Sequence, residues 1–138
     1  CSIKNGLPNA DIRAILEDND GSIWLGTYGG GIVKMSESVH NFHSAGNIIQ
    51  YTSKNGLIND KVECMMKDKD GSLWIGTDSG LSKFNGKTFT NYTTKQGLPK
   101  NIIRCLMQDD KKNIWIGSEE GGVSLFTPNE QSKGDGVF

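Results

Sequence analysis

One motif recurs three times along the sequence. "DGSIWLGT" at 20–27 returns as "DGSLWIGT" at 70–77 and, altered, as "KNIWIGS" at 112–118. The glycine of a preceding "GL" pair stands 18 residues before the tryptophan in every copy. Self-similarity with a period of about 20 to 50 residues is the signature of solenoids, propellers and arrays. The repeat therefore constrains the fold more strongly than any local pattern.

The repeating unit is about 41 residues long. The steps between successive tryptophans are 50 and 41 residues, and almost all of the surplus lies in "SESVHNFHSAGNIIQYT" compared with "NGKTFTNYT". Loops tolerate such insertions better than strands do. One copy therefore carries a long loop, and the unit itself is constant.

Each unit contains four short β-strand patterns. The first is expected at 12–17, 62–67 and 103–108, and the second at 22–27 and its copies; the third is "GIVKM", "GLSKF" and "GVSLF", and the fourth is "NIIQYT" and "TFTNYT". No segment has the roughly 10 to 12 residues between caps that a helix would need. Four antiparallel strands in about 41 residues are typical of one propeller blade. We predict an all-β fold of three such blades, part of an incomplete ring.

A tight hairpin is expected between the first and second strands of each blade. Asp20-Gly21 and Asp70-Gly71 are strong hairpin signals, which gives Gly21 and Gly71 a structural role. The third copy has Lys112-Asn113 there, and we expect Asn113 to accept the positive φ.

The tryptophan of each unit is expected to be structural. Burying a tryptophan removes on the order of 150 to 250 Å² from water, which is worth roughly 4 to 6 kcal/mol as an upper estimate. Blades packed face to face would use one such ring at each interface. We therefore expect Trp24, Trp74 and Trp115 to seal the contacts between blades.

The chain is expected to be a single propeller segment, 1–138. Its blades should span 5–53, 55–94 and 96–138, with the outer strand of the third incomplete. Cys1 is either the lipid-bearing first residue of a lipoprotein or a cut end, and the immediate start of the repeat favours the cut end. Three blades cannot close a ring of the usual 4 to 8 or so. We expect further blades, or a second copy of the chain, to complete it.

Composition excludes two classes of partner. Fifteen Lys and Arg oppose sixteen Asp and Glu, so the net charge of −1 gives no electrostatic attraction to nucleic acid or to an anionic membrane. No apolar run approaches the roughly 20 residues that a membrane-spanning helix needs. We expect neither partner for this segment.

Two of the three cysteines occupy equivalent places. Cys64 and Cys105 each lie ten residues before a tryptophan, as Ala14 does, so this column predicts a slot for a small buried side chain. A disulfide needs Cα atoms within about 7 Å, which packed blades would not usually allow. Both cysteines are expected to be free structural thiols.

The repeat resembles a known family. "NGLPNADIRAILEDNDGSIWLGTYGGGIVKM" is similar to the two-component regulator propeller repeat of the extracytoplasmic sensor region of bacterial hybrid sensor histidine kinases. The likeness rests on "GLP", a first strand ending in Asp, "DGxIWxGT" and "GG", over nearly the whole chain. It implies a seven-bladed periplasmic propeller, coupled to a kinase, that responds to oligosaccharides. The third copy departs from the pattern at Lys112-Asn113 and at Ser118.

Several patterns look like chemistry but favour structural roles. His40 and His43 have a spacing compatible with metal ligands, but no cysteine or carboxylate cluster accompanies them. "DNDG" and "DKDG" resemble a calcium loop, but the twelfth position holds Thr27 and Thr77 rather than Glu. We expect no catalytic residues, no metal and no cofactor in this segment.

A ligand face is expected where the first strands begin and the turns after the second strands end, a placement carried over from known propellers. It would present Arg13 and Tyr28, Glu63 and Asp78, and Arg104 and Glu119, beside Asn5, Asn9, Asp11, Asn59, Asp60, Lys100 and Asn101. Such groups can bind sugar hydroxyls or carboxylates, with Tyr28 as a stacking surface. An inter-blade Arg-Glu-Arg ion-pair ladder is an equally supported interpretation of the column Arg13, Glu63, Arg104.

Three functions remain open at this point. The preferred one is the ligand-sensing part of a periplasmic sensor in two-component signalling, with a small molecule or oligosaccharide as ligand. The second is a propeller enzyme of the streptogramin-lyase kind, which would need a catalytic His and metal-binding carboxylates on the ligand face. The third is an interaction scaffold without a ligand.

Overall fold

The computed structural model describes residues 6–36, 47–128 and 136–138. They form three four-stranded antiparallel sheets, which confirms the predicted all-β propeller blades. Two 3-10 turns, η4 (Ser53–Asn55) and η5 (Thr94–Gln96), connect successive sheets. The strands are, in blade one, β1 (Ile12–Glu17), β2 (Ile23–Thr27), β3 (Gly31–Met35) and β4 (Ile48–Tyr51); in blade two, β5 (Val62–Lys67), β6 (Leu73–Thr77), β7 (Gly80–Phe84) and β8 (Phe89–Tyr92); and in blade three, β9 (Ile103–Gln108), β10 (Ile114–Ser118), β11 (Gly122–Pro128) and β12 (Gly136–Val137).

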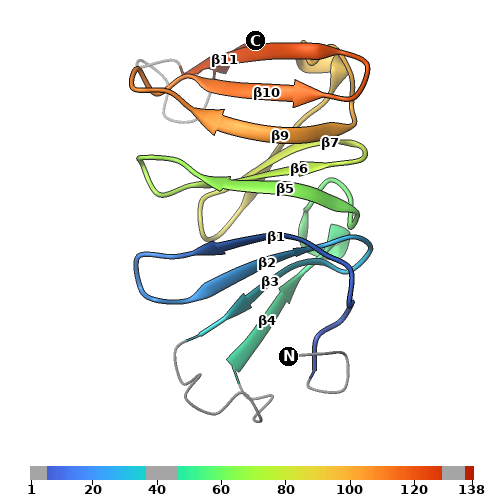
Figure 1. The fold of residues 1–138 in the computed structure, drawn as a ribbon, viewed down its shortest axis with the longest axis vertical. Coiled ribbons are helices and arrows are strands. Elements are labelled where there is room, and N and C mark those ends of the chain that lie inside the picture. Colours follow the sequence, from blue (N-terminus) through green and yellow to red (C-terminus); the bar gives the residue numbers. More distant parts are fainter. Residues whose placement is uncertain (1–5, 37–46, 129–135) are drawn as a thin grey trace.

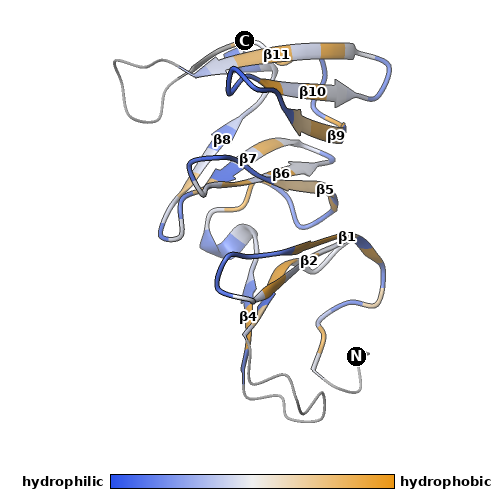
Figure 2. Cartoon of the chain, turned by 60° about the vertical axis from the view of Figure 1, so that its left-hand side comes forward, coloured by the Kyte–Doolittle hydropathy of each residue, from blue (hydrophilic) through white to orange (hydrophobic). Residues whose placement is uncertain are grey.

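The blades are stacked in chain order along the longest axis of the molecule (Figure 1). Within each blade, neighbouring strands in the sheet are also neighbours in the sequence. The first strands β1, β5 and β9 make the main strand contacts from one blade to the next. They are therefore the innermost strands of the stack. Hydrophobic residues lie mainly on the strands, and the turn between β1 and β2 is hydrophilic (Figure 2).

The hairpin turns require a positive φ at one place. Gly21 and Gly71 have φ of 79° and 90°, and the amide of each donates to the carbonyl oxygen of the aspartate three residues earlier. In blade three the equivalent residue is Lys112, with φ of 66°. The expectation that Asn113 takes this conformation was wrong, because the distance to the tryptophan sets the register of the turn and places Asn113 where Ser22 stands in blade one.

Each tryptophan is held by an aspartate of the same blade. The indole Nε1 atoms of Trp24, Trp74 and Trp115 donate to the aspartate six residues earlier, at 2.9, 2.8 and 2.9 Å. These acceptors are the carboxylates of Asp18, Asp68 and Asp109. The same carboxylate also accepts backbone amides of its turn, so it fixes the turn and the ring together.

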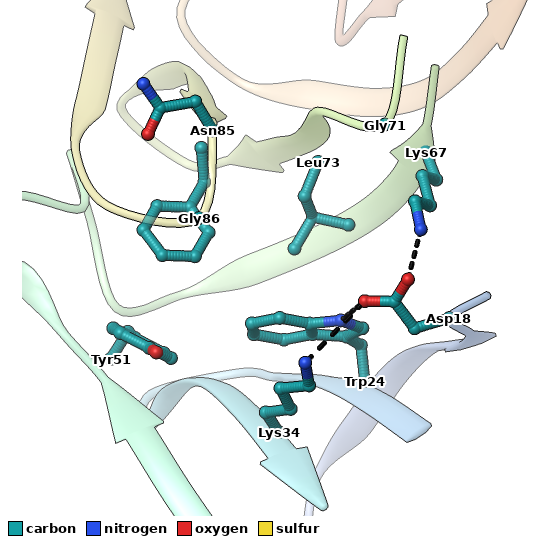
Figure 3. A pocket seen from close by; sticks show the side chains of 10 residues that line it. Asp18, Trp24, Lys34, Tyr51, Lys67, Gly71, Leu73, Asn85 and Gly86 are labelled. Atoms are coloured by element: carbon teal, nitrogen blue, oxygen red, sulfur yellow. Dashed lines mark hydrogen bonds and ion pairs between the residues drawn. The ribbon is translucent and has the colours of Figure 1, made fainter. Parts of the chain in front are cut away.

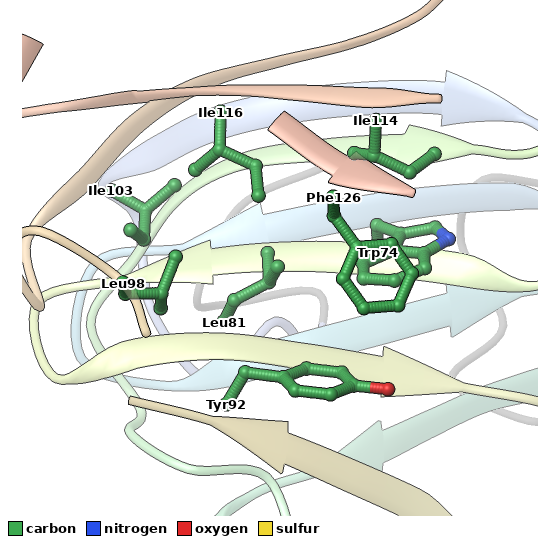
Figure 4. Close-up of a cluster of buried hydrophobic side chains, with 8 residues drawn as sticks. All are labelled: Trp74, Leu81, Tyr92, Leu98, Ile103, Ile114, Ile116 and Phe126. Carbon is green, nitrogen blue, oxygen red and sulfur yellow. The ribbon is translucent and has the colours of Figure 1, made fainter. Parts of the chain in front are cut away.

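Two hydrophobic clusters of the described residues lie between neighbouring blades, and a third is formed by blade one alone. Trp74 packs against Phe126 of blade three, with ring centroids 5.1 Å apart, and stacks with Tyr92 of its own blade at 5.9 Å (Figure 4). Trp24 likewise meets Phe84 of blade two at 6.1 Å. Trp24 and Trp74 are therefore buried, whereas Trp115 is 40% exposed because no other described part of the chain covers its blade.

The small residue at the equivalent position of each first strand lies opposite a glycine of the second strand. Ala14, Cys64 and Cys105 pair with Gly26, Gly76 and Gly117 of the second strand. Both cysteines are free, as expected. Burial raises the pKa of the Cys64 thiol to about 12. Cys64 is partly buried and Cys105 is exposed, so the expected burial is met only in part at Cys64 and is wrong for Cys105.

The end of the second strand differs in blade three. Thr27 and Thr77 each donate a side-chain hydrogen bond to the carbonyl oxygen at the start of the third strand, at 2.9 and 2.8 Å. In place of these threonines stands Ser118, whose buried hydroxyl has no partner in the described parts of the chain. Replacing the threonine by serine therefore coincides with the loss of one structural hydrogen bond.

Some expectations concern residues outside those that the structure describes. They are the interpretations of Cys1 and Asn5, of the His40 and His43 pair, and of the long loop of blade one. Among the described residues, no helix has the length and apolar character needed to cross a membrane.

Candidate functional site

The six predicted ligand-face residues come together along one edge of the stack, where the first strand of each blade begins. The residue that begins each first strand pairs with the residue that ends the second: Ile12 with Thr27, Val62 with Thr77, and Ile103 with Ser118. The side chains that follow these pairs along the chain are therefore neighbours. They are Arg13 and Tyr28, Glu63 and Asp78, and Arg104 and Glu119.

Glu63 joins the three blades along this edge. Its carboxylate lies 3.3 Å from Nη1 of Arg13 in blade one and 2.9 Å from Nη1 of Arg104 in blade three. The Glu63 side chain is 7% exposed, whereas those of Arg13 and Arg104 are 38% and 44% exposed. The ion-pair ladder considered from the sequence is thus formed. Its centre is buried and its two ends face solvent.

Each arginine also has a carboxylate partner in its own blade. Arg13 donates two hydrogen bonds to Asp11, at 2.9 and 3.1 Å. These bonds lower the pKa of Asp11 and raise that of Arg13. Arg104 donates to Glu119 at 2.6 Å, which raises the pKa of the Arg104 guanidinium. Both arginines therefore stay charged, and a ligand anion would compete with carboxylates already in place.

Tyr28 links the first two blades beside the ladder. Its hydroxyl donates to Asp78 of blade two at 2.6 Å, and this hydrogen bond raises the pKa of the tyrosine. The guanidinium carbon of Arg13 lies 4.3 Å from the ring centroid, and Nζ of Lys61 lies 5.6 Å from it. Since Arg13 covers one face of the ring, at most the other face is available for stacking with a ligand.

The six side chains form one continuous set of contacts, which we call the rim network. It runs from Asp78 through Tyr28, Arg13, Glu63 and Arg104 to Glu119. Two of its members are cationic and three are anionic at neutral pH. The network therefore presents donors and acceptors of both signs and has no surplus of positive charge.

The other polar residues expected on this face hold the loops. Asn9 accepts from the amide of Asp11 at 2.7 Å and donates to the carbonyl oxygen of Tyr28 at 3.2 Å. Asn59 accepts from the amide of Lys61 at 2.8 Å. Asp60 and Asn101 accept the amides that begin η4 and η5, at 2.6 and 3.0 Å. These side chains position the rim network, and Lys100 lies beside Gly121.

A pocket of about 130 Å³ lies between blades one and two, near the β1–β2 turn (Figure 3). Trp24, Tyr51 and Phe84 form its aromatic wall. At its polar side, Asp18 pairs with Lys67 of blade two and lies 3.8 Å from Nζ of Lys34. The ion pair between Asp18 and Lys67 therefore links blades one and two at this pocket.

The sequence analysis missed the aspartates that hold the tryptophans, and Lys61 beside Tyr28. The aspartates had a signal, since Asp stands six residues before the tryptophan in all three copies. Lys61 had none, because only folding brings it to the ring. In the described part of the chain, no group of three or more His, Cys, Asp or Glu side chains is placed to hold a metal ion.

The sequence matches one protein family, described as two component regulator propeller. The match comprises three copies, at residues 6–29, 56–79 and 97–120. Each copy begins at the glycine of "GL" and ends just after the second strand. The matched segments therefore contain the hairpin, the tryptophan and the rim positions of each blade. A comparison with curated protein sequences gave no significant match.

Solved propellers share the fold. The extracellular domain of the hybrid two component system BT3049 from B. thetaiotaomicron superposes with a TM-score of 0.74 at 21% identity, over 91% of this chain and 18% of that one. The corresponding domain of BT4673 gives 0.70 at 20%, over 90% and 18%. Virginiamycin B lyase from Staphylococcus aureus gives 0.60 at 16%, over 86% and 42%. The chain thus spans about a fifth of the two extracellular domains.

Proposed function

Because the chain belongs to the two component regulator propeller family, we propose that it is part of the extracytoplasmic, ligand-sensing region of a two-component signalling protein. The proposal places the ligand at the rim network. A carbohydrate is the proposed ligand, and signal output is assigned to domains other than these blades. The similar fold of the two B. thetaiotaomicron extracellular domains supports this assignment.

One observation carries the proposal: side chains from three separate repeats form a single network along one edge of the stack. A purely structural ion pair needs only two partners, whereas this network continues from blade to blade and leaves both arginines and Glu119 substantially exposed. Such a surface offers a ligand several donors and acceptors in fixed positions. Fixed polar groups of this kind give binding sites their specificity.

The charges favour a neutral ligand over an anionic one. A ligand carboxylate would have to displace Glu63 or Glu119 from Arg104, and would approach the three acidic members of the network. Hydroxyl groups can donate to the carboxylates and accept from the guanidinium groups without displacing either. A neutral oligosaccharide that bridges the three blades therefore fits the rim network better than an acidic one.

The two alternatives have weaker support. Similarity to virginiamycin B lyase is at 16% identity and concerns the fold alone. The scaffold alternative accounts for the ion-pair ladder, but it gives no reason why the arginines at both ends of the ladder are exposed to solvent.

A binding experiment tests the proposal. The chain is screened on an array of neutral and acidic oligosaccharides, and the sugars that bind are titrated by calorimetry. We expect binding of neutral oligosaccharides and at least a tenfold loss of affinity in Arg104→Ala and in Asp78→Ala. Lys87→Ala, in the turn between β7 and β8 at the opposite end of blade two, is the control and should bind as wild type does.

Two outcomes would contradict the proposal. Unchanged affinity in both rim variants would place the ligand elsewhere on the blades. No binding to any oligosaccharide on the array would favour a scaffold.

A further inference from the structure

Two Asn-Gly pairs lie wholly within the described part of the chain. Asn55-Gly56 closes the η4 turn, Asn85-Gly86 lies in the loop between β7 and β8, and all four residues are exposed. An asparagine followed by glycine is open to attack on its side-chain amide by the next backbone nitrogen, because glycine has no Cβ atom to hinder the approach. The two pairs are the same in covalent terms, so only the folded structure distinguishes them.

The loop between β7 and β8 activates the side-chain amide of Asn85. The backbone amides of Lys87 and Thr88 donate to its Oδ1 atom, at 2.9 and 2.8 Å. Two donors on one carbonyl oxygen stabilise the negative charge that develops there when a nucleophile attacks the carbon, as an oxyanion hole does. The Cγ atom of Asn85 is therefore a prepared electrophile.

The backbone N–H of Gly86 is free to supply the nucleophile. It donates to no other residue in the described part of the chain. Gly86 has a φ of 96°, and a Cβ atom placed on it would meet nothing within 4 Å. Water can therefore reach this amide and take its proton.

At the other pair the corresponding atoms are held in place. The N–H of Gly56 donates to the carbonyl oxygen of Ser53 at 3.2 Å. Oδ1 of Asn55 accepts from the amide of Thr52 at 2.9 Å, as part of the capping box of η4. The ring of Phe89 closes one side, since a Cβ atom on Gly56 would lie 3.3 Å from it. Attack by the Gly56 nitrogen would break the hydrogen bond that ends the turn.

We propose that Asn85-Gly86 is a site of spontaneous deamidation in the folded protein, whereas Asn55-Gly56 is protected. The nitrogen of Gly86 gives its proton to water and attacks Cγ of Asn85. The N–Cγ bond forms, the bond from Cγ to Nδ2 breaks, and the leaving nitrogen takes up a proton from water and departs as ammonia. Water then hydrolyses the cyclic imide at either carbonyl carbon, which gives aspartate or isoaspartate. The reaction does not depend on the ligand at the rim network.

Its position gives the reaction a structural effect. Asn85 and Gly86 line the pocket between blades one and two (Figure 3). At the two ends of their loop, Phe84 and Phe89 pair across the hairpin, with ring centroids 4.4 Å apart. Phe84 also contacts Tyr51 of blade one, with 5.0 Å between centroids. Isoaspartate adds one atom to the backbone of the loop that spaces the two phenylalanines, so its formation loosens the contact of blade two with blade one.

Timed incubation at pH 8 tests the site, with the chain either folded or unfolded in urea. Mass spectrometry of peptides follows deamidation at each pair. In the folded chain we expect Asn85 to react at least tenfold faster than Asn55. In urea neither pair has a turn around it, so we expect the two rates to converge. Equal rates in the folded chain would overturn the proposal. A tenfold difference that persisted in urea would come from neighbouring residues rather than from the loop, and would overturn it as well.

Thermal unfolding tests the effect on the blades. The fraction that carries isoaspartate is separated by chromatography and identified by labelling with an isoaspartyl methyltransferase. We expect it to melt at a lower temperature than the unreacted chain. Asn85→Asp is the matched control, since its carboxylate can accept the same two amides without lengthening the backbone, and it should melt as wild type does. Equal melting of the isoaspartyl fraction and wild type would overturn the effect on the contact between blades one and two.

Discussion

The carboxylate of Asp68 accepts a hydrogen bond from the indole Nε1 of Trp74 at 2.8 Å, and both side chains are buried between blades two and three. The same carboxylate accepts from the amides of Asp70 and Ser72, at 3.0 and 2.9 Å. One side chain therefore ties the hairpin turn to the ring that seals the interface. Asp109 makes the equivalent bond to Trp115 on the exposed outer face of blade three.

Removing this carboxylate should be costly only where it is buried. Asp68→Ala leaves the indole N–H of Trp74 without an acceptor away from water, and should lower the free energy of unfolding by about 1 to 3 kcal/mol. Asp109→Ala is the matched control, since water can replace the acceptor at the exposed Trp115. Urea unfolding of both variants measures the difference. Equal losses would show that the turn, rather than burial of the ring, sets the stability.

Adding a methyl group at Gly76 should disrupt the contact between blades two and three. The new Cβ atom would lie 2.4 Å from Sγ of Cys64 and 2.7 Å from Cγ2 of Ile103, so both blades would have to move. We expect Gly76→Ala to cost about 1 to 3 kcal/mol, as overpacked cores do. The new Cβ atom of Gly117→Ala would meet only Cys105 of its own blade, on the exposed outer face of blade three, so this variant should cost less. Thermal unfolding would contradict this account if the two variants melt together.

Neutralising Glu63 should weaken the cohesion of the three blades. Glu63→Gln keeps the size of the side chain but removes the charge that Arg13 and Arg104 share. We expect a loss of about 1 to 2 kcal/mol, reduced from the value for a fully buried pair because both arginines reach solvent. The loss should shrink as salt is raised. Glu119→Gln, at the exposed end of the rim network, is the control, and an equal effect there would argue against Glu63 as the central link.

The two described thiols should differ in reactivity. Burial raises the pKa of Cys64 to about 12, so this residue is a protonated thiol throughout the neutral range. Cys105 is exposed. Since the thiolate is the reactive species, iodoacetamide at pH 8 should modify Cys105 at least tenfold faster than Cys64. Mass spectrometry of peptides after timed quenching measures both rates, and comparable rates would mean that blades two and three separate readily.

Acid should weaken the contact that Asp18 makes with Lys67 between blades one and two. Burial alone would raise the pKa of Asp18, but hydrogen bonds from Lys67 and Trp24 outweigh burial and lower it. A carboxylate with a lowered pKa contributes stability above its unfolded-state pKa of about 3.9, and this contribution is lost as the pH falls through the folded-state value. Asp18→Asn should therefore flatten the fall in stability below about pH 4. Chemical unfolding between pH 6 and pH 3 tests this, and an unchanged slope would exclude Asp18 as a contributor.

Much of the fold could be predicted because the sequence pattern that specifies each strand and turn recurs in every repeat. The apolar positions and the turn residues recur at fixed distances from each tryptophan, so β1, β5 and β9 occur at the predicted residues. The one local error, the positive φ at Lys112 rather than Asn113, arose from aligning by residue type. The hydrogen bonds of the turn impose this left-handed backbone conformation on Lys112, although lysine does not itself favour it.

The candidate site could be predicted only as a set of residues. The sequence shows that Arg13, Glu63 and Arg104 occupy equivalent positions in the three repeats. It supports a ligand site and an ion-pair ladder equally well at these positions. The structure shows the ion pairs, and the role in ligand binding stays a prediction. The contact between Tyr28 and Lys61 had no sequence signal, because it depends on how two blades meet.

By itself, the sequence determined the unit of the fold: four strands, a hairpin and one tryptophan per blade, because hydrophobic spacing and turn chemistry act over a few residues. Only the tertiary structure decided which charges pair and which surfaces stay open. The position of Glu63 between two arginines depends on the distance between blades, which side-chain packing between separate repeats sets.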